Sequence, residues 1–336
     1  MIDELRPLVP GPLGDGLRAA WVGRSFGFWP ERPLMLLTSL RDDALREGAP
    51  HPLWRALGGE GDPDLGSITP SAVAAAVAPD RAHLWRSLGE RHVQTNDPSR
   101  AVAWMWPAAL AAELEPDRAL ALFDFGASAG LNLVADRLPW VWTTAAGDPL
   151  APAGVPEVGA RRGFDLRPPD LRDPEDARWL EALIWPGQDE RLERFRAGLA
   201  AFRELAAEAG RPLVERASVE DAAAALEPRR AGDPRGIAYQ SVMHDYLPAD
   251  VRERYEEGLR AWLRGSDPGA ALWIEFEITE GGTDGETAFA ISVHQRAGAG
   301  LETTVLARCG PHPRVLTVDD EAVARFRVML GESATG

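Results

Sequence analysis

The most informative absence in this chain of 336 residues is that of lysine, since all 36 basic residues are arginine. Without lysine there is no phosphate-loop lysine, no Schiff base and no serine–lysine dyad. P-loop kinases and ATPases, pyridoxal enzymes, class I aldolases and acyl transferases of the penicillin-binding type are therefore excluded. Asparagine is nearly as rare and occurs only at Asn96 and Asn132.

Cysteine occurs once, at Cys309, which excludes an intrachain disulfide and a zinc site built on thiolates. The six histidines form no His-x-x-x-His pair, so we expect no metal site. No apolar run approaches the roughly 18 residues that a membrane span needs. The amino-terminal segment is too acidic and proline-rich for a signal peptide. We therefore expect a soluble cytoplasmic protein with no membrane partner.

The chain is strongly acidic, with a formal net charge of −16 and a pI near 4.9. Nucleic-acid binding depends on many contacts from basic side chains to phosphates, so we expect no nucleic-acid partner. The expected substrate is a small molecule. The sequence carries no signal for an oligomeric state.

Short apolar runs alternate with helical stretches from about residue 118, which predicts a doubly wound, mostly parallel α/β sheet. The last two runs are joined by the glycine-rich turn AGAG and form an antiparallel hairpin. We expect a helical amino-terminal cap over 1–117, the α/β domain over 118–312, and a carboxy-terminal helix and tail over 313–336. The predicted strands are Ala119–Phe125, Val158–Leu166, Leu213–Ala217, Gly236–Met243, Ala270–Ile278, Thr287–Gln295 and Glu302–Cys309, and predicted helices include Leu34–Leu45, Ser71–Val77, Arg81–Leu88, Asp189–Ala209 and Ala249–Leu263.

The stretch LFDFGASAGLN lies where the first strand turns into a helix predicted from about Ser128. Open α/β sheets bind ligands at this carboxyl edge, and the first N–H groups of a helix are free to contact them. The spacing of one acidic residue and two glycines is that of the nucleotide loop in class I methyltransferases, whose sheet also ends in a hairpin. We therefore expect S-adenosylmethionine as cofactor, with Asp124 holding the charged amino group of its methionine part. The predicted cofactor-binding residues of this stretch are Asp124, Gly126, Ala127, Ser128, Gly130 and Asn132.

The same stretch also fits G-x-S-x-G, the nucleophile elbow of serine hydrolases, in which Ser128 would attack the substrate. That interpretation needs an oxyanion donor loop upstream, commonly His-Gly-Gly, and none precedes Ala119. It also gives no role to the aspartate two residues before the first glycine. The sequence favours the methyltransferase, and the serine hydrolase is the alternative.

A second carboxylate is expected to hold the ribose hydroxyls of the cofactor. Asp165 stands in GFDLRP at the end of the second predicted strand, where an acid can accept both hydroxyl protons. It lies 41 residues after Asp124, whereas such acids usually follow about 20 residues on. Asp148, at 24 residues, is the competing candidate.

Two polar clusters complete the candidate site. HVQTNDPSR precedes the first strand and offers donors and acceptors for a ligand head group, although a helix-capping loop explains it equally well. AYQSVMHDYLP follows the fourth strand, whose end faces the methyl acceptor in methyltransferases. His244 titrates near neutral pH and is the predicted catalytic base, with Asp245 as the other optional base. The predicted pocket residues are Gln94, Thr95, Asn96, Gln240, Ser241 and Tyr246.

The next strand contains WIEFE, in which two acids alternate with apolar residues. If this segment is a strand, Trp273, Glu275 and Glu277 share one face. The alternation then lines up two carboxylates toward the edge of the sheet.

Five separated motifs of the chain resemble one bacterial family, domain of unknown function 2332, over about residues 20–310. The resemblance implies a class I methyltransferase core with a helical amino-terminal extension. Ala217 stands where the family pattern has an aspartate that would approach adenine, and Gln240 stands where it has a histidine. The Ala217 departure leaves a non-catalytic binding module of the same fold as a further alternative. The motifs are VQTN, DFGASAGLN, RGFDLRP, WLEALIWPGQDERLERF and YQSVMHDYLP.

Overall fold

The structure is a computed structural model that describes residues 11–26, 31–58, 61–94, 97–140, 142–150, 154–279 and 287–334. The chain folds into two compact units. We call them the helical unit and the α/β unit. The helical unit comprises Met1–Asn96 and Asp170–Arg196, and the α/β unit comprises Asp97–Pro169 and Ala197–Gly336.

The helical unit is built from short helices whose starts are marked by capping residues. Thr69 caps α5 by accepting a hydrogen bond from the N–H of Ala72, and Asp173 caps α8 by accepting from Glu175. Both caps are followed by proline in the first helical turn. The predicted helices α3, α5 and α6 are confirmed. The elements are α2 (Pro12–Ala20), α3 (Glu31–Glu47), α4 (Trp54–Leu57), η2 (Leu65–Ser67), α5 (Pro70–Ala76), α6 (Ala82–Glu90) and α8 (Pro174–Ala182), and the long helix α9 (Asp189–Ala209) begins here.

A buried carboxylate, Asp42 of α3, holds α8 in the helical unit. One oxygen of Asp42 accepts a hydrogen bond from Nε of Arg178 at 2.8 Å, and the other lies 2.7 Å from Nε2 of His83. The ion pair joins positions 136 residues apart. Residues 170–196, which the sequence alone assigns to the α/β domain, therefore pack with the amino-terminal helices.

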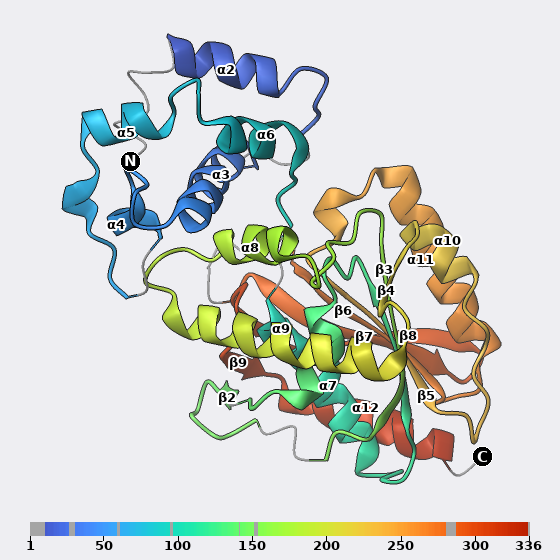
Figure 1. The fold of residues 1–336 in the computed structure, drawn as a ribbon. Helices are drawn as coiled ribbons and strands as arrows, with labels where there is room; N and C mark the ends of the chain where they lie inside the picture. Colours follow the sequence, from blue (N-terminus) through green and yellow to red (C-terminus); the bar gives the residue numbers. More distant parts are fainter. Residues whose placement is uncertain are drawn as a thin grey trace. The chain divides into compact units, whose positions relative to one another are not determined.

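Among the described residues, the α/β unit has one nine-stranded sheet of order β2-β9-β8-β7-β6-β5-β1-β3-β4 (Figure 1). Five of the eight neighbouring pairs are parallel, and the pairs from β6 to β9 are antiparallel. The predicted α/β class with a mostly parallel open sheet is confirmed, and β2 and β9 are additional. The strands are β1 (Leu120–Phe125), β2 (Thr143–Thr144), β3 (Val158–Asp165), β4 (Val214–Arg216), β5 (Arg235–Ser241), β6 (Ala271–Ile278), β7 (Phe289–Ala297), β8 (Gly300–Cys309) and β9 (Val315–Val318).

The direction in which strands are added reverses at β1. From β1 the chain adds β3 and then β4 on one side, and it returns to add β5 and β6 on the other side. In open α/β folds, ligands bind outside the carboxyl ends of the two strands that flank such a reversal, which are β1 and β5 here. The fold therefore places the loops after β1 and β5 at the position where open α/β sheets bind ligands.

Strand register assigns the side chains to two faces. Asp124 pairs with Tyr239 on one face, whereas Phe125 pairs with Gln240, and Gln240 with Glu275, on the other. η4 and α7 cover the first face, and α10 and α11 pack their apolar side chains on the second. We call these the η4 face and the α11 face. The other elements of this unit are η3 (Pro98–Ala101), α7 (Val102–Ala112), η4 (Leu131–Arg137), α10 (Val219–Ala224), η5 (His244–Tyr246), α11 (Ala249–Gly265) and α12 (Asp320–Ala334).

Candidate functional site

The loop after β1, residues 126–130, is held by bonds to the end of β3, and we call it the glycine loop. The N–H groups of Gly126 and Ala127 donate to the main-chain oxygen of Phe164 at 2.9 and 3.1 Å. The N–H of Ser128 donates to Oδ2 of Asp165 at 2.9 Å. The carboxylate predicted to hold the ribose thus lies beside the glycine loop.

Both glycines of the loop are required by backbone conformation and by packing. Gly126 has φ +68° and Gly130 has φ +80°, in the left-handed region. A Cβ on Gly126 would lie 2.9 Å from Sδ of Met243, and one on Gly130 would lie 2.6 Å from Cγ2 of Val214. These neighbours are protein atoms, so close packing accounts for the two glycines.

The helix predicted from about Ser128 is wrong in both type and start. A 3-10 helix, η4, begins at Leu131 instead. Ser128 has φ +50°, which no helical residue adopts, and the N–H of Gly130 donates to Ala127. Because most N–H groups of the loop are bonded within the protein, the expected cradle of free helix-start N–H groups does not form.

Four side-chain atoms near the glycine loop are buried and have no hydrogen-bond partner among the described residues. They belong to β1, to the glycine loop, to η4 and to η3, and η3 packs against η4. A buried acceptor or hydroxyl without a partner costs about 1–3 kcal/mol. Such a group calls for a partner, which can be a water molecule or a ligand. The atoms are Oδ2 of Asp124, Oγ of Ser128, Oδ1 of Asn132 and Oγ of Ser99.

Asp124, near the carboxyl end of β1, is an acid with only 2% exposure. Burial raises the pKa of Asp124 well above its ordinary value, and the negative charge of Asp165 adds to the rise. A cation placed beside Asp124 would restore the ionised form. The surroundings of Asp124 within the protein therefore disfavour its ionised form.

The structure separates the two candidates for the ribose carboxylate. Asp165 lies against the glycine loop, and its Oδ1 also accepts from the N–H of Arg167 at 2.8 Å. Asp148 is exposed in the turn after β2, six strands away from β1 in the sheet. At roughly 4.8 Å per strand this is about 29 Å. Only Asp165 is near the loop.

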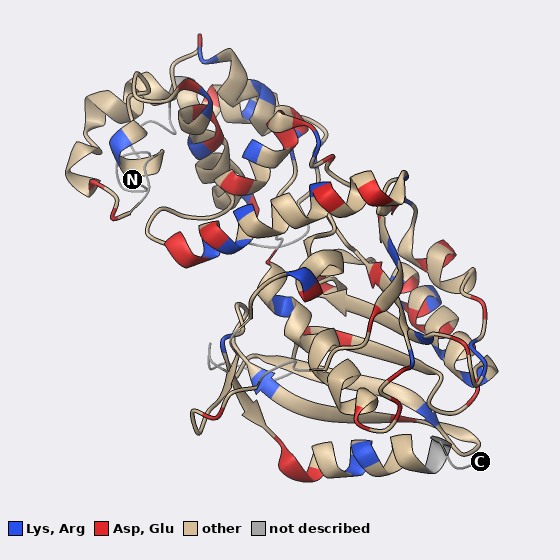
Figure 2. Ribbon diagram, turned by 60° about the horizontal axis from the view of Figure 1, so that its bottom comes forward, with Lys and Arg blue, Asp and Glu red and all other residues tan. Residues whose placement is uncertain are grey.

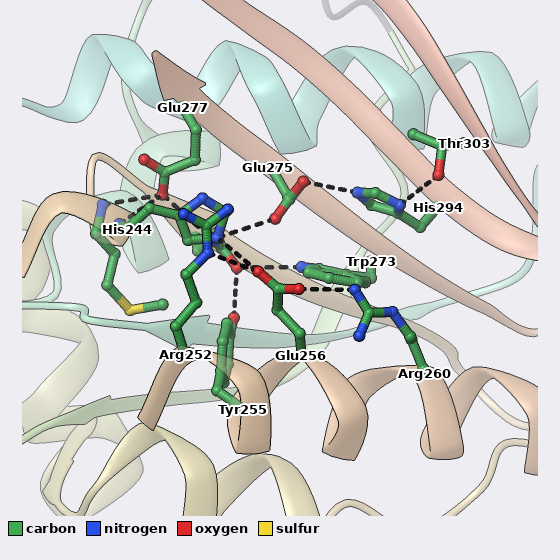
Figure 3. A network of polar contacts seen from close by, with 12 residues as sticks. His244, Arg252, Tyr255, Glu256, Arg260, Trp273, Glu275, Glu277, His294 and Thr303 are labelled. Carbon is green, nitrogen blue, oxygen red and sulfur yellow. Dashed lines mark hydrogen bonds and ion pairs between the residues drawn. The ribbon is translucent and has the colours of Figure 1, made fainter. Parts of the chain in front are cut away.

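A second polar cluster lies on the α11 face, and we call it the His244 network (Figure 3). Its centre is Nε2 of His244, which lies 2.7 Å from Nε2 of Gln240, 3.2 Å from Oε1 of Glu275 and 3.9 Å from Oε1 of Glu256. Burial lowers the pKa of His244, but the bond to Glu275 and the charge of Glu277 outweigh it, so the pKa is raised. The predicted base thus belongs to a connected set of titratable groups.

The amide of Gln240 has a fixed orientation in this network. Nε1 of Trp273 donates to Oε1 of Gln240 at 3.1 Å, and the hydroxyl of Tyr255 donates to the same atom at 2.6 Å. An indole nitrogen can only donate, so the oxygen must face Trp273 and the NH2 group must face His244 and Glu277. Gln240, predicted as a pocket residue, therefore has both ends of its amide bonded within the protein.

Glu275 bridges two histidines. Its Oε2 lies 2.7 Å from Nε2 of His294, whose Nδ1 lies 2.7 Å from Oγ1 of Thr303. The ring of His294 stacks on Trp273 with centroids 4.1 Å apart. Burial raises the pKa of Glu275, but the bonds from the two histidines and their charges lower it to about 2. Charged residues occur on the strands as well as on the helices (Figure 2), and Glu275 is one of two acids on β6.

Acid titration tests the charge state of Glu275. Its pKa is 4.5 in the unfolded chain and about 2 in the folded protein. The stability it contributes is complete above pH 4.5 and is lost as the pH falls toward 2. We expect the wild type to lose roughly 2 kcal/mol more between pH 6 and pH 3 than Glu275→Gln, measured by urea unfolding. Equal losses would contradict the assignment.

The glycine loop and the His244 network meet at Met243. The N–H of Met243 donates to Oε1 of Glu277 at 2.9 Å, and its side chain lies against Gly126. Burial raises the pKa of Glu277. The loops after β1 and β5 also contain the two described non-glycine residues with positive φ, Ser128 at +50° and Val242 at +52°. Backbone strain of this kind concentrates at functional sites. Here it occurs in the two loops beside the reversal of strand order between β1 and β5.

The other predicted site residues are less closely connected. Asp245 and Tyr246 are exposed in η5, and Ser241 is half-buried at the end of β5. Gln94 is half-buried in the helical unit. The predicted residues Thr95 and Asn96 lie outside the described residues.

One group of potential metal ligands occurs among the described residues, in the helical unit. It comprises Asp43, Glu47 and His51. The guanidinium of Arg81 lies 2.5 Å from an oxygen of each of the two acids. Arg81 therefore already supplies the positive charge that the carboxylates need.

The chain was compared with known families and proteins. The model of a family described as "Uncharacterized protein conserved in bacteria (DUF2332)" matches residues 29–317. The chain belongs to this family. The matched region of this DUF2332 protein contains the glycine loop and the His244 network, and it covers most of each compact unit. No curated protein and no solved structure matches the chain. In the part of the chain that the structure describes, no helix is long and apolar enough to cross a membrane.

Proposed function

We propose that this DUF2332 protein binds S-adenosylmethionine at the carboxyl ends of β1 and β5 and transfers its methyl group to a small molecule. The observation that carries the proposal is the buried carboxyl of Asp124, whose Oδ2 has no partner among the described residues. Asp124 lies on β1, where the direction of strand addition reverses, and open α/β folds bind ligands at such a reversal. The strained residues Ser128 and Val242 at the same edge support a ligand site.

The groups around the glycine loop fit this cofactor. The carboxylate of Asp124 can hold the ammonium of the methionine part, because that contact satisfies its free oxygen and offsets its desolvation. Asn132 offers an amide oxygen to a donor of the ligand. Asp165 already accepts one N–H at each oxygen, and the remaining lone pairs can accept ribose hydroxyls.

In the proposed reaction the cofactor supplies a reactive methyl group, and the protein supplies alignment and a base. Among the described residues, the His244 ring makes its contacts through Nε2, which leaves Nδ1 to take a proton from the acceptor. Apolar side chains at the same carboxyl edge can cover the acceptor. These are Leu166 after β3, Tyr246 after β5 and Ile278 at the end of β6, all at least 41% exposed.

A matched pair of acid variants tests the assignment of the ribose carboxylate. We expect Asp165→Ala to weaken S-adenosylhomocysteine binding about 10–100-fold by calorimetry, since charge-assisted hydrogen bonds of about 1.5–3 kcal/mol are lost. Asp148→Ala removes an equal charge from a distant turn and should bind like the wild type. Circular dichroism of both variants is the control that shows whether they are folded. Loss of binding in Asp148→Ala, or its retention in Asp165→Ala, would overturn the assignment.

One observation favours the serine hydrolase as a second candidate. Ser128 has φ +50°, and a strained backbone at the serine is a property of nucleophile elbows. However, Oγ of Ser128 is buried and contacts no described histidine, so a general base is lacking. We therefore expect no labelling of Ser128 by a fluorophosphonate probe. Labelling of the wild type that Ser128→Ala abolishes would replace the methyltransferase proposal with the hydrolase.

A further inference from the structure

One nitrogen of His244, Nε2, lies close to two possible hydrogen-bond partners. Nε2 of His244 lies 2.7 Å from the NH2 nitrogen of Gln240 and 3.2 Å from Oε1 of Glu275. The amide can only donate, because Trp273 fixes its orientation, whereas the carboxylate can only accept. Nε2 therefore accepts from Gln240 when it is bare and donates to Glu275 when it carries a proton. The two bonds exclude each other.

The carboxylate is the stronger partner. A hydrogen bond to an ionised group is roughly twice as strong as one between neutral groups. Glu275 is also held in place, because the hydroxyl of Thr303 can donate to Nδ1 of His294 and Nε2–H of His294 can then donate to Glu275. This direction of donation gives Oε2 of Glu275 a donor from His294. It leaves Oε1 of Glu275 as an acceptor for His244.

We propose that Glu275, held by His294 and Thr303, is a positioning residue that keeps a proton on Nε2 of His244 and so makes Nδ1 the basic atom. Nδ1 is the ring nitrogen that makes none of the network contacts described above. An imidazole whose inner nitrogen donates to a carboxylate is oriented and stabilised as it takes a proton at its outer nitrogen. Gln240 opposes this state and favours the other tautomer. The catalytic importance of this arrangement rests on the proposed methyl transfer, but the tautomer itself does not.

The groups that face His244 come from three elements. β6 contributes Glu275 and Glu277, and β7 contributes His294 behind Glu275. α11 contributes Glu256, and this acid is already paired with two arginines at 2.7 and 2.6 Å. Glu275 is therefore the carboxylate nearest to Nε2 and the one whose removal should change its protonation. The paired arginines are Arg252 and Arg260.

Nitrogen-15 spectra of histidine-labelled protein, without any ligand, test the proposal. A His244→Gln variant assigns the signals, and His83 of the helical unit, bonded to Asp42, is the internal reference. In the neutral form of the wild type we expect the proton on Nε2. In Glu275→Gln we expect the proton on Nδ1 and a pKa of His244 lower by about one to two pH units, since an opposite charge is lost.

The outcomes decide the proposal even if Glu275→Gln does not fold. A wild-type His244 with its proton on Nδ1 would overturn it, and so would a tautomer and pKa that are the same in wild type and Glu275→Gln. Thr303→Val, on the exposed side of β8, should shift the signals of His294 and lower the Nε2–H fraction of His244 to a smaller extent. Unchanged signals of both histidines in Thr303→Val would also contradict the proposal. Failure to bind S-adenosylhomocysteine would refute the proposed function alone.

Discussion

Asp124→Ala is expected to weaken S-adenosylhomocysteine binding about 30-fold or more while making the ligand-free protein more stable at neutral pH. Binding falls because the variant leaves the ammonium of the ligand in a buried site without its counter-charge, a loss of about 2–5 kcal/mol. Stability rises because the wild type buries a carboxyl that has an oxygen without a partner. Removing it should gain about 1–2 kcal/mol.

The pH dependence gives this prediction a second measurement. The pKa of Asp124 is raised in the folded protein, so the unfolded chain loses this proton first as the pH rises above 3.8. The wild type therefore loses stability from about pH 4 upward until the folded-state pKa is passed. Asp124→Ala lacks this loss, so its advantage in urea unfolding should grow with pH. A variant that binds like the wild type, or that is equally destabilised at every pH, would contradict the role of Asp124.

Gly130→Ala is expected to cost roughly 2–5 kcal/mol of unfolding free energy. The left-handed φ of +80° strains any residue with a side chain, and the new Cβ would lie 2.6 Å from Val214 and 3.0 Å from Phe202. Gly147→Ala is the matched control, because Gly147 has φ +89° but no atom within 4 Å of an added Cβ. Gly147→Ala should therefore lose only the unfolding free energy that backbone strain costs, about 1–2 kcal/mol. Equal costs in urea unfolding would mean that the glycine loop does not pack as described.

The parallel core of the sheet could be predicted because its strands are local apolar runs. β1, β5 and β6 are nearly continuous stretches of buried residues, and each lies within a residue or two of its predicted bounds. β2 and β9 have only two and four residues, and they form by pairing with each other across the chain. A period of two cannot be recognised in segments this short. Helix α9 was predicted with its exact bounds because its capping and breaking residues are local.

The candidate site was predictable in part, because some of its residues also belong to local sequence patterns. The acid and glycine spacing identified Asp124 and the loop, and strand alternation placed Glu275 and Glu277 on one face. The contacts of Glu275 with His294 and of His294 with Thr303 depend on the register of β6, β7 and β8, which no local pattern determines. The left-handed Ser128 overrides the helical propensity of the residues around it. Local sequence patterns therefore predict which residues share a loop or a strand face. They do not predict the contacts between side chains of different strands.

The edge of the sheet at Asp124 is the proposed binding site for S-adenosylmethionine. The most direct test of this site is a calorimetric titration of S-adenosylhomocysteine into the wild-type protein. We expect saturable heat with one site per chain. No heat of binding up to millimolar ligand would contradict the proposed site.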